Sequence, residues 1–373
     1  MKICFVGVAK SIHVQRWVKW FAERGHEVHL ISPYYAEIDG IKLHETSRKK
    51  IKFINFVREA FKVRKLVWKI KPDILHAHYV TSNGFFAAFA NYHPFLVSVW
   101  GSDILREAKE SFIKKNIIGY SLKKADIVIP TARSMVTYLT NEFALSRDKI
   151  VRIPWGIDLK IFHRGYEKEV EKLRKKLKIG GKKWVVLSPR GMRPNYSNNH
   201  LIMEAIPLVI KKHPNTIFIF LRGNASASFE EEMKKKVSKL GIDSNVRFIS
   251  SFLSPPEMAI YYNMSDIMLS LPYTDQFAFT IMEGVVCGSI PIVSNIDVYK
   301  QYLTDGKNAF YVDPDDPKEL AEKIIYCIEH PEIKESFYKI NRTIIEENEN
   351  WDKNTKKMEK LYEKLVKAGR VDR

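Results

Sequence analysis

TDQFAFTIMEGVVCGSIPIVS, residues 274–294, is the most informative stretch of the chain. A polar loop passes into a short helical pattern that opens at about Phe279, and a turn at Gly288 leads into an apolar strand. Asp275 places one carboxylate before the helix, and Glu283 places a second about one turn inside it. The first N–H groups of a helix lack intrahelical partners and attract anions. The stretch therefore predicts a site for a ligand with both hydroxyl and phosphate groups, such as a nucleotide sugar.

Short apolar runs alternate with helical patterns on both sides of this stretch. In the first half they are Lys2–Val6, Val28–Ser32, Ile74–His78, Phe95–Val99 and Ile127–Pro130. In the second half they are Trp184–Ser188, Thr216–Leu221, Val246–Ile249, Ile267–Leu271, Ile290–Val293 and Ala309–Val312. Continuous apolar strands between helices predict parallel sheets covered on both faces. We expect an α/β protein with two doubly wound, Rossmann-like domains facing a central cleft, and ligands at the carboxyl ends of the strands.

The domain boundary is predicted from length and pattern. A chain of 373 residues exceeds one compact core. The alternation breaks around residues 155–158 and a very basic stretch at 168–178. We therefore expect domains at 1–165 and 166–350, followed by a terminal helix at about 351–368 that crosses back onto the first domain.

Several features favour a cytoplasmic protein. The N-terminus begins with a strand and a turn rather than a signal peptide. No apolar run approaches the roughly 20 residues that span a bilayer. Cys4, Cys287 and Cys327 lie far apart in apolar elements, which predicts buried free thiols and no metal-binding spacing.

The net charge of +18 is concentrated in the first half. Residues 1–165 carry 28 Lys and Arg against 14 Asp and Glu. The excess is densest at 48–71, a segment that also has a helical apolar stripe. One interpretation is a solvated face of a helix packed on its own sheet. The other is contact with an anionic acceptor or with anionic lipid, which would place the protein at the inner membrane face.

The order of several short motifs resembles one enzyme family. After Glu283, the run Cys287-Gly288-Ser289-Ile290-Pro291-Ile292-Val293 keeps the register of that family's signature. Four further matches are His26-Glu27-Val28, Pro72-Asp73-Ile74-Leu75-His76-Ala77-His78, Trp100-Gly101-Ser102-Asp103 and Ile153-Pro154-Trp155-Gly156-Ile157-Asp158. The chain resembles the retaining glycosyltransferases of family four, the group one glycosyl transferases with the GT-B fold. The resemblance implies transfer of a hexose from a nucleotide diphosphate sugar to a lipid-linked, polysaccharide or other glycan acceptor.

The resemblance also implies roles for donor-side residues. Arg190 would grip the donor pyrophosphate, Asp275 would hold hydroxyls of the donor sugar, and Glu283 would hold the ribose hydroxyls. Phe277, Ala278, Phe279 and Thr280 would offer backbone N–H groups, and residues near Ser251 would recognise the base. The alternatives are a surface arginine at 190, a helix-capping Asp275 and a Glu283 that pairs with a lysine.

Two departures from the family pattern concern charge and loop stiffness. Asn195 stands where the family has a second pyrophosphate-binding Lys, and Arg193 is the nearest replacement cation. Asp275 replaces a Glu, while Gln276 and Ala278 replace two glycines. The resemblance implies no cofactor and no divalent metal, because Arg190 and a helix end would neutralise the diphosphate.

Acceptor-side candidates follow strand ends of the first domain: His13, His78, Trp100 and Asp103. Trp100 is a candidate for stacking on a sugar ring, and Asp103 alternatively caps a helix. A histidine in such a position is more often structural than catalytic.

Two other functions remain open. The same fold can bind a nucleotide sugar without turning it over, a hypothesis motivated by Asn195 and Asp275. Nucleic-acid binding rests on net charge alone, because neither a known module nor exposed aromatics among basic residues can be recognised in the sequence. We expect a nucleotide sugar, not nucleic acid, as the partner.

Overall fold

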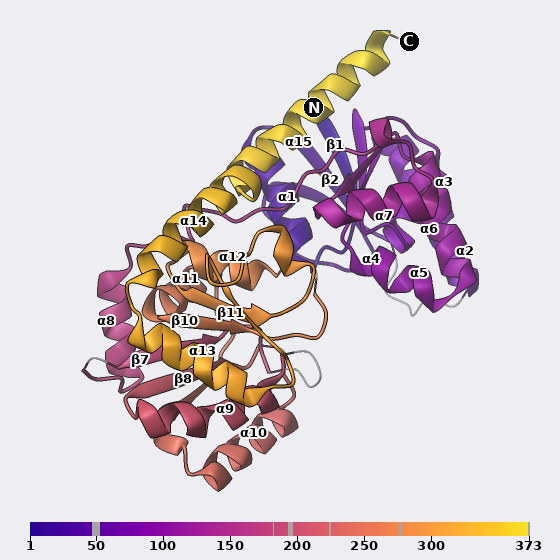
Figure 1. Cartoon of the computed structure of the whole chain (residues 1–373). Helices are drawn as coiled ribbons and strands as arrows, with labels where there is room; N and C mark the ends of the chain where they lie inside the picture. Colours follow the sequence, from indigo (N-terminus) through magenta and orange to yellow (C-terminus); the bar gives the residue numbers. More distant parts are fainter. Residues whose placement is uncertain (47–52, 182, 193–196, 224, 276–277, 372–373) are drawn as a thin grey trace. The chain divides into compact units, whose positions relative to one another are not determined.

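The computed structural model describes residues 1–46, 53–181, 183–192, 197–223, 225–275 and 278–371. The chain divides into two compact units (Figure 1). One unit contains Met1–Trp155 together with Asp352–Arg373, and the other contains Gly156–Trp351. The sequence placed the passage between the domains at residue 165, whereas the chain enters the second unit at Gly156.

The first unit is built on a six-stranded parallel sheet with the order β3-β2-β1-β4-β5-β6. Its strands are β1 (Lys2–Val6), β2 (Glu27–Ser32), β3 (Ile41–Glu45), β4 (Ile74–His78), β5 (Phe95–Val99) and β6 (Ile127–Pro130). β3 was not predicted, because this edge strand is polar and only partly buried. The others match the predicted apolar runs, with β2 one residue longer.

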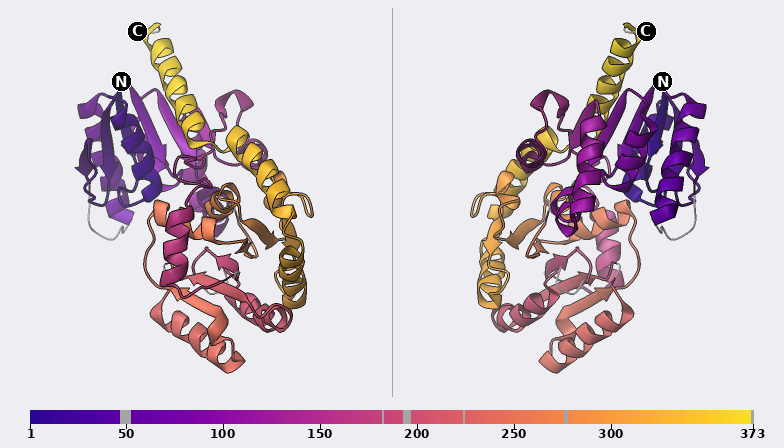
Figure 2. Two further views of the ribbon diagram at one scale, coloured as in Figure 1. Left: turned by 90° about the vertical axis from the view of Figure 1, so that its left-hand side faces the viewer. Right: turned by 90° about the vertical axis from the view of Figure 1, so that its right-hand side faces the viewer.

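Helices cover both faces of this sheet (Figure 2). They are α1 (Ile12–Glu23), α2 (Phe53–Ile70), α3 (Ser82–Ala90), α4 (Ser102–Leu105), α5 (Glu107–Glu110), α6 (Phe112–Lys124), α7 (Arg133–Phe143) and α15 (Trp351–Val371). α2, α3, α6 and α7 bury apolar side chains against one face. On the other face Phe21 of α1 and Tyr362 of α15 stack 5.0 Å apart over the sheet.

The second unit repeats this topology with the order β12-β11-β10-β7-β8-β9, also parallel. Its strands are β7 (Trp184–Ser188), β8 (Thr216–Leu221), β9 (Val246–Ile249), β10 (Ile267–Ser270), β11 (Ile290–Ser294) and β12 (Phe310–Val312). Three match the predicted runs and three differ by one residue at an end. Each sheet reverses its strand order at the middle, between β1 and β4 or between β7 and β10. Ligands of doubly wound folds bind at such a reversal.

The helices of the second unit also lie on both faces of their sheet. They are α8 (Glu167–Lys176), α9 (Asn199–Lys212), α10 (Ala227–Leu240), α11 (Pro255–Met264), α12 (Phe279–Val286), α13 (Pro317–Glu329) and α14 (Ile333–Asn348). α9, α10 and α13 pack on one face, while α11 and α12 pack on the other. A capping box between Ser254 and Glu257 opens α11, and all three cysteines are buried and unbridged.

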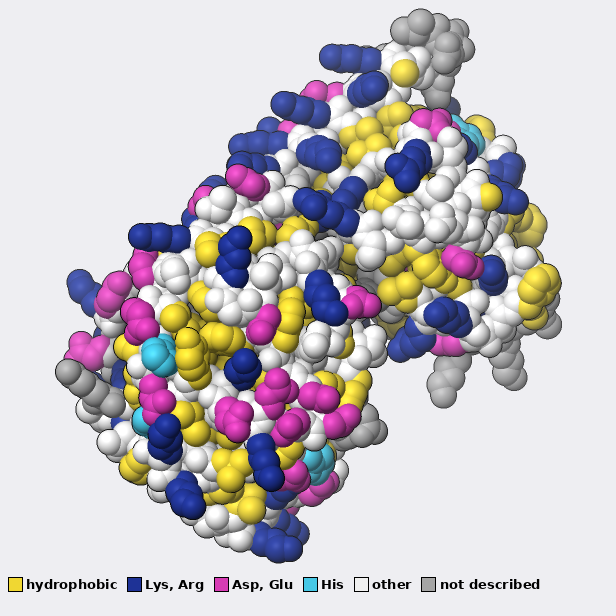
Figure 3. Space-filling view, viewed as in Figure 1, with side chains coloured by type: hydrophobic (Ala, Val, Ile, Leu, Met, Phe, Trp, Pro, Cys, Tyr) yellow, Lys and Arg dark blue, Asp and Glu magenta, His cyan; other side chains and the backbone are white. Residues whose placement is uncertain are grey.

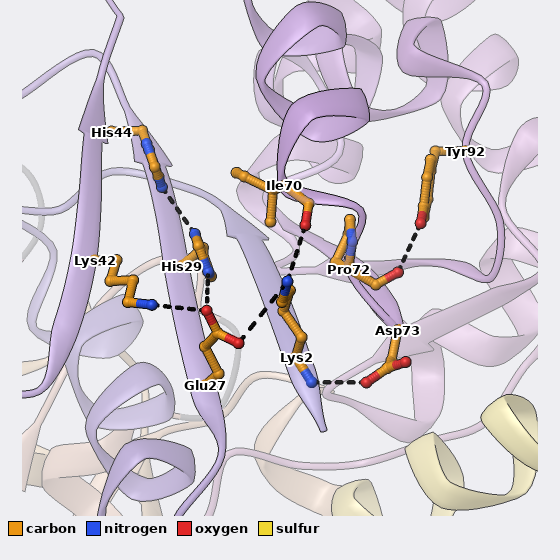
Figure 4. A network of polar contacts seen from close by, with 9 residues as sticks. All are labelled: Lys2, Glu27, His29, Lys42, His44, Ile70, Pro72, Asp73 and Tyr92. Carbon is orange, nitrogen blue, oxygen red and sulfur yellow. Dashed lines mark hydrogen bonds and ion pairs between the residues drawn. The ribbon is translucent and has the colours of Figure 1, made fainter.

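Polar contacts tie together the amino ends of the first strands (Figure 4). The backbone N–H of Lys2 donates to Asp73 at 2.8 Å, and the Lys2 ammonium lies 3.9 Å from Glu27. Glu27 also contacts the His29 ring at 3.1 Å, and His29 Nδ1 lies 2.9 Å from His44 Nε2. These contacts link the amino ends of β1 and β2 with the residue before β4, and they reach along β2 to His44 of β3.

Across the described ranges, no helix combines the length and the apolar character needed to cross a bilayer.

Candidate active site

Arg190 is the centre of a polar cluster at the strand reversal of the second sheet. It lies two residues beyond β7, beside the carboxyl end of β10. Its Nη1 donates to Ser270 Oγ at 3.0 Å and to Tyr299 Oη at 3.1 Å, and its guanidinium forms an ion pair with Asp275. The side chains of Arg190 and Asp275 are each only 6% exposed. The surface-arginine alternative is therefore wrong.

Tyr299 holds the Asp275 carboxylate in place. Its hydroxyl donates to Asp275 Oδ2 at 2.6 Å, so the Ser270 hydroxyl, 3.2 Å away, donates to Tyr299. Burial, together with the nearby Asp275 charge, raises the pKa of Tyr299 far above its ordinary value. The phenol therefore stays protonated and keeps donating. Sequence reasoning missed Tyr299, which lies in a short loop helix without a recognisable pattern.

The helix α12 begins beside this cluster, at the predicted residue Phe279. Its N-cap residue, Ala278, makes no side-chain bond to the helix, and the first turn has no acidic residue. The bonds of the Asp275 carboxylate go to Arg190 and Tyr299 instead of the capping role given as the alternative. The positive end of the helix dipole favours an anion.

Glu283 lies one turn into α12 and is partly buried. Tyr262 of α11 donates to Glu283 Oε2 at 3.1 Å, and burial raises the pKa of Tyr262 well above its ordinary value. A Cβ atom at Gly284 would lie 2.3 Å from Met268 Sδ of β10. Glycine at this position therefore lets α12 lie close against β10, which fixes where Glu283 points.

The remaining predicted donor-side residues lie at different places in the structure or outside its described part. Arg193, Asn195 and Phe277 lie outside the described residues. Thr280 is partly buried at the start of α12, and its hydroxyl has no hydrogen-bond partner within the described part of the chain. Ser251 is exposed just beyond β9, which is two strands away from β7 in the sheet.

Three aromatic rings meet at the carboxyl edge of the first sheet. The ring of His13 lies 4.5 Å from that of Trp155 and 5.8 Å from that of Trp100, and the two indoles are 4.7 Å apart, edge to face. All three side chains are partly exposed. His13 and Trp100 were predicted at this edge, whereas Trp155 was seen only as part of a motif. An aromatic wall of this kind suits stacking against a sugar ring.

Asp103 and His78 lie beneath these rings and are fully buried. Asp103 accepts backbone N–H bonds from Val80, Trp100, Gly101 and Ile104 at 2.7–3.2 Å. Burial nevertheless raises the pKa of Asp103 to about 6. The bonds show that Asp103 fixes the loops after β4 and β5. Its predicted alternative role as an N-cap is wrong, because Asp103 lies within α4 and the N-cap residue is Gly101.

His78 is enclosed by the rings of Phe5, Trp17 and Trp100 at 5.5–6.3 Å. Neither of its ring nitrogens finds a hydrogen-bond partner among the described residues. Burial, aided by the nearby His13, lowers the pKa of His78 to about 3. The histidine is therefore neutral at physiological pH.

This burial predicts a pH dependence of stability. The folded pKa of His78 lies below the unfolded value of 6.5, so its stabilising effect is complete above pH 6.5 and is lost as the pH falls toward 3. Between pH 7 and pH 5 the free energy of unfolding should fall by about 2 kcal/mol on account of His78 alone. Denaturant unfolding followed by tryptophan fluorescence measures it. The variant His78→Leu should show a dependence weaker by that amount, and an unchanged dependence would contradict the assignment.

No group of three or more His, Cys, Asp or Glu side chains is placed to hold a metal ion in the described ranges. The polar cluster of the second unit consists of one cation (Arg190), two carboxylates (Asp275 and Glu283), two phenols (Tyr262 and Tyr299) and the start of α12.

Comparison with known proteins decides the family. The family model for glycosyl transferases group 1 matches residues 169–358, which include the whole Arg190 cluster and α12. A model for glycosyl transferase 4-like proteins matches residues 2–132. The chain belongs to the glycosyl transferases group 1 family. It is therefore a glycosyltransferase, and its two Rossmann-like units are those of the GT-B fold.

Individual relatives are distant. The chain is 26% identical to spore coat protein SA of Bacillus subtilis over 65% of this chain and 68% of that protein. It is 24% identical to alpha-monoglucosyldiacylglycerol synthase of Acholeplasma laidlawii over 83% of this chain and 82% of the relative. The Anabaena protein HepE, solved in complex with UDP, is 16% identical, with a TM-score of 0.81 and coverage of 98% of this chain and 100% of that one. This last likeness supports the fold.

Proposed function

We propose that this glycosyltransferase moves a hexose from a nucleotide diphosphate sugar to a lipid-linked or other glycan acceptor, with retention of anomeric configuration and without a metal ion. The observation that carries the proposal is the Arg190 cluster at the strand reversal, next to the start of α12. A buried guanidinium beside a helix N-terminus suits a diphosphate, since both provide positive charge. The names of two relatives agree with the donor and acceptor classes: HepE was solved with UDP-glucose, and the Acholeplasma enzyme is a glucosyldiacylglycerol synthase.

Each donor group has a counterpart in the second unit. Arg190 and the N–H groups of α12 receive the diphosphate, Glu283 accepts the ribose hydroxyls, and Asp275 accepts hydroxyls of the sugar. Tyr262 orients Glu283 through a bond of 3.1 Å, and Tyr299 orients Asp275 through a bond of 2.6 Å. Neither phenol has to touch the donor, so both are positioning residues.

The donor has to loosen the ion pair between Arg190 and Asp275 when it binds. This requirement favours ligands that carry a phosphate. A guanidinium can serve carboxylate and phosphate with the same planar fork. In the proposed complex the diphosphate shares or replaces Asp275 at Arg190, and the carboxylate turns to the sugar while Tyr299 keeps its bond. A sugar without phosphate would leave the cation without compensation, so free hexoses should bind poorly.

The transfer step needs charge stabilisation on the leaving group. The bond between the anomeric carbon and the phosphate oxygen breaks as the acceptor oxygen bonds to the same carbon on the same face. The acceptor proton passes to the leaving phosphate oxygen. Arg190 and the positive end of α12 stabilise the charge that develops there, a role in which a single donor is worth about 100- to 1,000-fold in rate.

The first unit offers the acceptor surface of this proposal. His13, Trp100 and Trp155 form the aromatic wall described above, and aromatic faces pack well against the C–H faces of sugars. Burial lowers the pKa of His13 to about 4. At neutral pH its imidazole therefore carries no charge and can accept a hydrogen bond from an acceptor hydroxyl.

The test is donor hydrolysis followed by proton NMR, with UDP-, GDP- and ADP-hexoses, with and without EDTA. We expect turnover of one nucleotide class, unchanged by EDTA, with the first-formed sugar in the configuration of the donor. Glu283→Gln should raise the donor KM by about 10- to 100-fold and change kcat less, because ribose contacts are similar in ground and transition states. The exposed Glu322→Gln on α13 is the matched control.

Two outcomes would overturn the proposal. Release of sugar with inverted configuration contradicts retention. Tight binding of a nucleotide sugar with no turnover in the presence of any acceptor would instead support the alternative of a binding protein that lacks activity.

A further inference from the structure

The helices α2, α3 and α6 form a continuous layer on one face of the first sheet (Figure 1). Neighbouring helices join through aromatic rings, with Phe56 of α2 lying 5.1 Å from Phe85 of α3 and Phe85 lying 5.6 Å from Tyr120 of α6. The inner sides of these helices fill the core of the unit. Their outer sides face away from the sheet.

The outer side of α2 consists only of apolar and cationic side chains. Between Asn55 and Ile70 the exposed residues are Val57, Arg58, Phe61, Lys62, Arg64, Lys65, Trp68 and Lys69. Val57, Phe61 and Trp68 are 42%, 58% and 49% exposed. At 3.6 residues per turn these three lie within about 40° of one another on the helix. They form one exposed apolar stripe with cations along it.

The cations on this side of α2 have no carboxylate partner among the residues that the structure describes. The one carboxylate of α2, Glu59, is buried and accepts a hydrogen bond from Thr46. Lys62 and Arg64 donate to the backbone carbonyls of Thr46 and Phe89. Across the described residues of α2, no Lys or Arg pairs with a carboxylate. The cations keep their full charge for an external partner.

The surface continues onto the neighbouring helices. The ring of Phe61 lies edge-on to Phe89 at 5.0 Å, and that of Trp68 lies edge-on to Tyr92 at 5.4 Å. α3 carries no charged residue. α6 carries four lysines and no acidic residue of its own, and two of the four, Lys114 and Lys115, pair with glutamates of α5 and α7. On the right-hand side of Figure 3, which shows part of the first unit, dark blue and yellow side chains lie close together, with a few magenta ones among them.

Trp68 stands as a ridge between two hollows on this surface. One hollow, of about 580 Å³, is lined by Phe61, Arg64, Lys65 and Trp68. The other, of about 550 Å³, lies between Trp68, Lys71, Tyr92 and the end of α15, and Asp73 also lines it. The first hollow therefore combines an aromatic wall with two cations and no carboxylate among its lining residues, an arrangement suited to a group that is partly apolar and negatively charged.

We propose that the outer surface of α2, continued by the ends of α3 and α6, docks on the surface of an anionic lipid bilayer. An interfacial helix presents aromatic and aliphatic residues to the acyl boundary and Lys or Arg to anionic headgroups. Protein interfaces are depleted in lysine, so a second protein fits this composition less well. Single-stranded nucleic acid binds along a charged groove in which successive bases stack on a row of rings, whereas the described part of α2 offers two strongly exposed rings, Phe61 and Trp68, about two helical turns apart.

The docking surface and the donor site can be tested separately. A bilayer location would bring the enzyme to a lipid-linked acceptor, so the inference supports that acceptor class of the proposed function. Vesicle binding needs no nucleotide and no turnover. If the transferase proposal fails, vesicle binding can therefore still be measured and interpreted. If vesicle binding fails, donor turnover can likewise still be measured.

The experiment is co-sedimentation of the full-length chain with phosphatidylcholine vesicles, with and without phosphatidylglycerol. We expect binding to the anionic vesicles only. Arg58→Glu/Lys65→Glu should weaken it about 10-fold or more. Phe61→Ser, which removes the most exposed ring of α2, should weaken it about 5-fold. The thermal midpoint of each variant is measured alongside to verify folding.

Lys235→Glu/Lys239→Glu is the matched control, because it makes the same charge change at exposed residues of α10 in the second unit. It should change vesicle binding by less than about 2-fold. The proposal is overturned if the unmodified chain ignores anionic vesicles, if the control weakens binding as much as the α2 variant, or if the α2 surface binds an oligonucleotide and not vesicles.

Discussion

Replacing Arg190 with alanine should lower the free energy of unfolding by about 3–5 kcal/mol, because the buried Asp275 carboxylate loses its cation. The same change should lower kcat/KM for the donor by about 100- to 1,000-fold, because the leaving diphosphate loses a directed positive charge. Stability is measured by denaturant titration, and turnover by donor hydrolysis. Two roles for one side chain follow from its bonds to Asp275, Ser270 and Tyr299.

The double variant Arg190→Ala/Asp275→Ala separates these two roles. With both charges removed, Ser270 and Tyr299 can still bond each other across 3.2 Å. The double variant should therefore be more stable than Arg190→Ala by about 1–3 kcal/mol. It should remain as inactive as the single variant. Equal or additive destabilisation would show that the two groups are not coupled in the folded protein.

Gly156→Ala should lower the free energy of unfolding by about 3 kcal/mol or more. Gly156 has φ of +72°, and a Cβ atom there would lie 2.6 Å from the Glu349 carbonyl oxygen and 2.7 Å from the Trp351 nitrogen. Both neighbours are backbone atoms, so neither can rotate away. The clash would disrupt the pairing of Ile157 with Glu349 and Trp351, whose bonds are 2.6 and 3.0 Å. This pairing joins the two segments at which the chain enters and leaves the second unit.

Gly241→Ala is the matched control for this prediction. Gly241 has φ of +67° at the end of α10, and a Cβ atom there would meet nothing within 4 Å. The substitution should cost only the backbone strain of about 1–2 kcal/mol. Thermal unfolding compares the two variants directly. A Gly156→Ala midpoint no lower than that of Gly241→Ala would contradict the close approach at Gly156.

The fold could be predicted from the sequence because both sheets are parallel and buried. Strands such as β4 and β8 are buried at every position, so most of their residues are apolar and β8 has five apolar residues in a row. The edge strand β3 carries Lys42, His44 and Glu45 and lies largely outside the core. Its sequence therefore has no apolar run from which a strand could be predicted. The tandem alternation of strands and helices then gave two doubly wound units.

The site could be predicted residue by residue but not as a network. The positions of Arg190 and Asp275 after neighbouring strands placed both at one sheet edge. The ion pair between Arg190 and Asp275 depends on side-chain geometry, which residue spacing does not encode. The hydrogen bond from Tyr299 to Asp275 could not be predicted for the same reason. The exposed aromatics among the α2 cations were also missed, because Phe61 and Trp68 could equally have faced the core.

The most direct test of the donor site is a thermal-shift titration of the full chain with UDP, GDP, ADP, CMP and their sugar conjugates, with and without EDTA. A ligand at about 100 times its Kd adds about 2.7 kcal/mol of stability, which corresponds to roughly 5–10 °C in Tm for a domain of this size. We predict such a shift for one nucleoside diphosphate, unchanged by EDTA and absent in Arg190→Ala/Asp275→Ala. No shift with any of these ligands, or a shift that survives in the double variant, would contradict a donor site at Arg190.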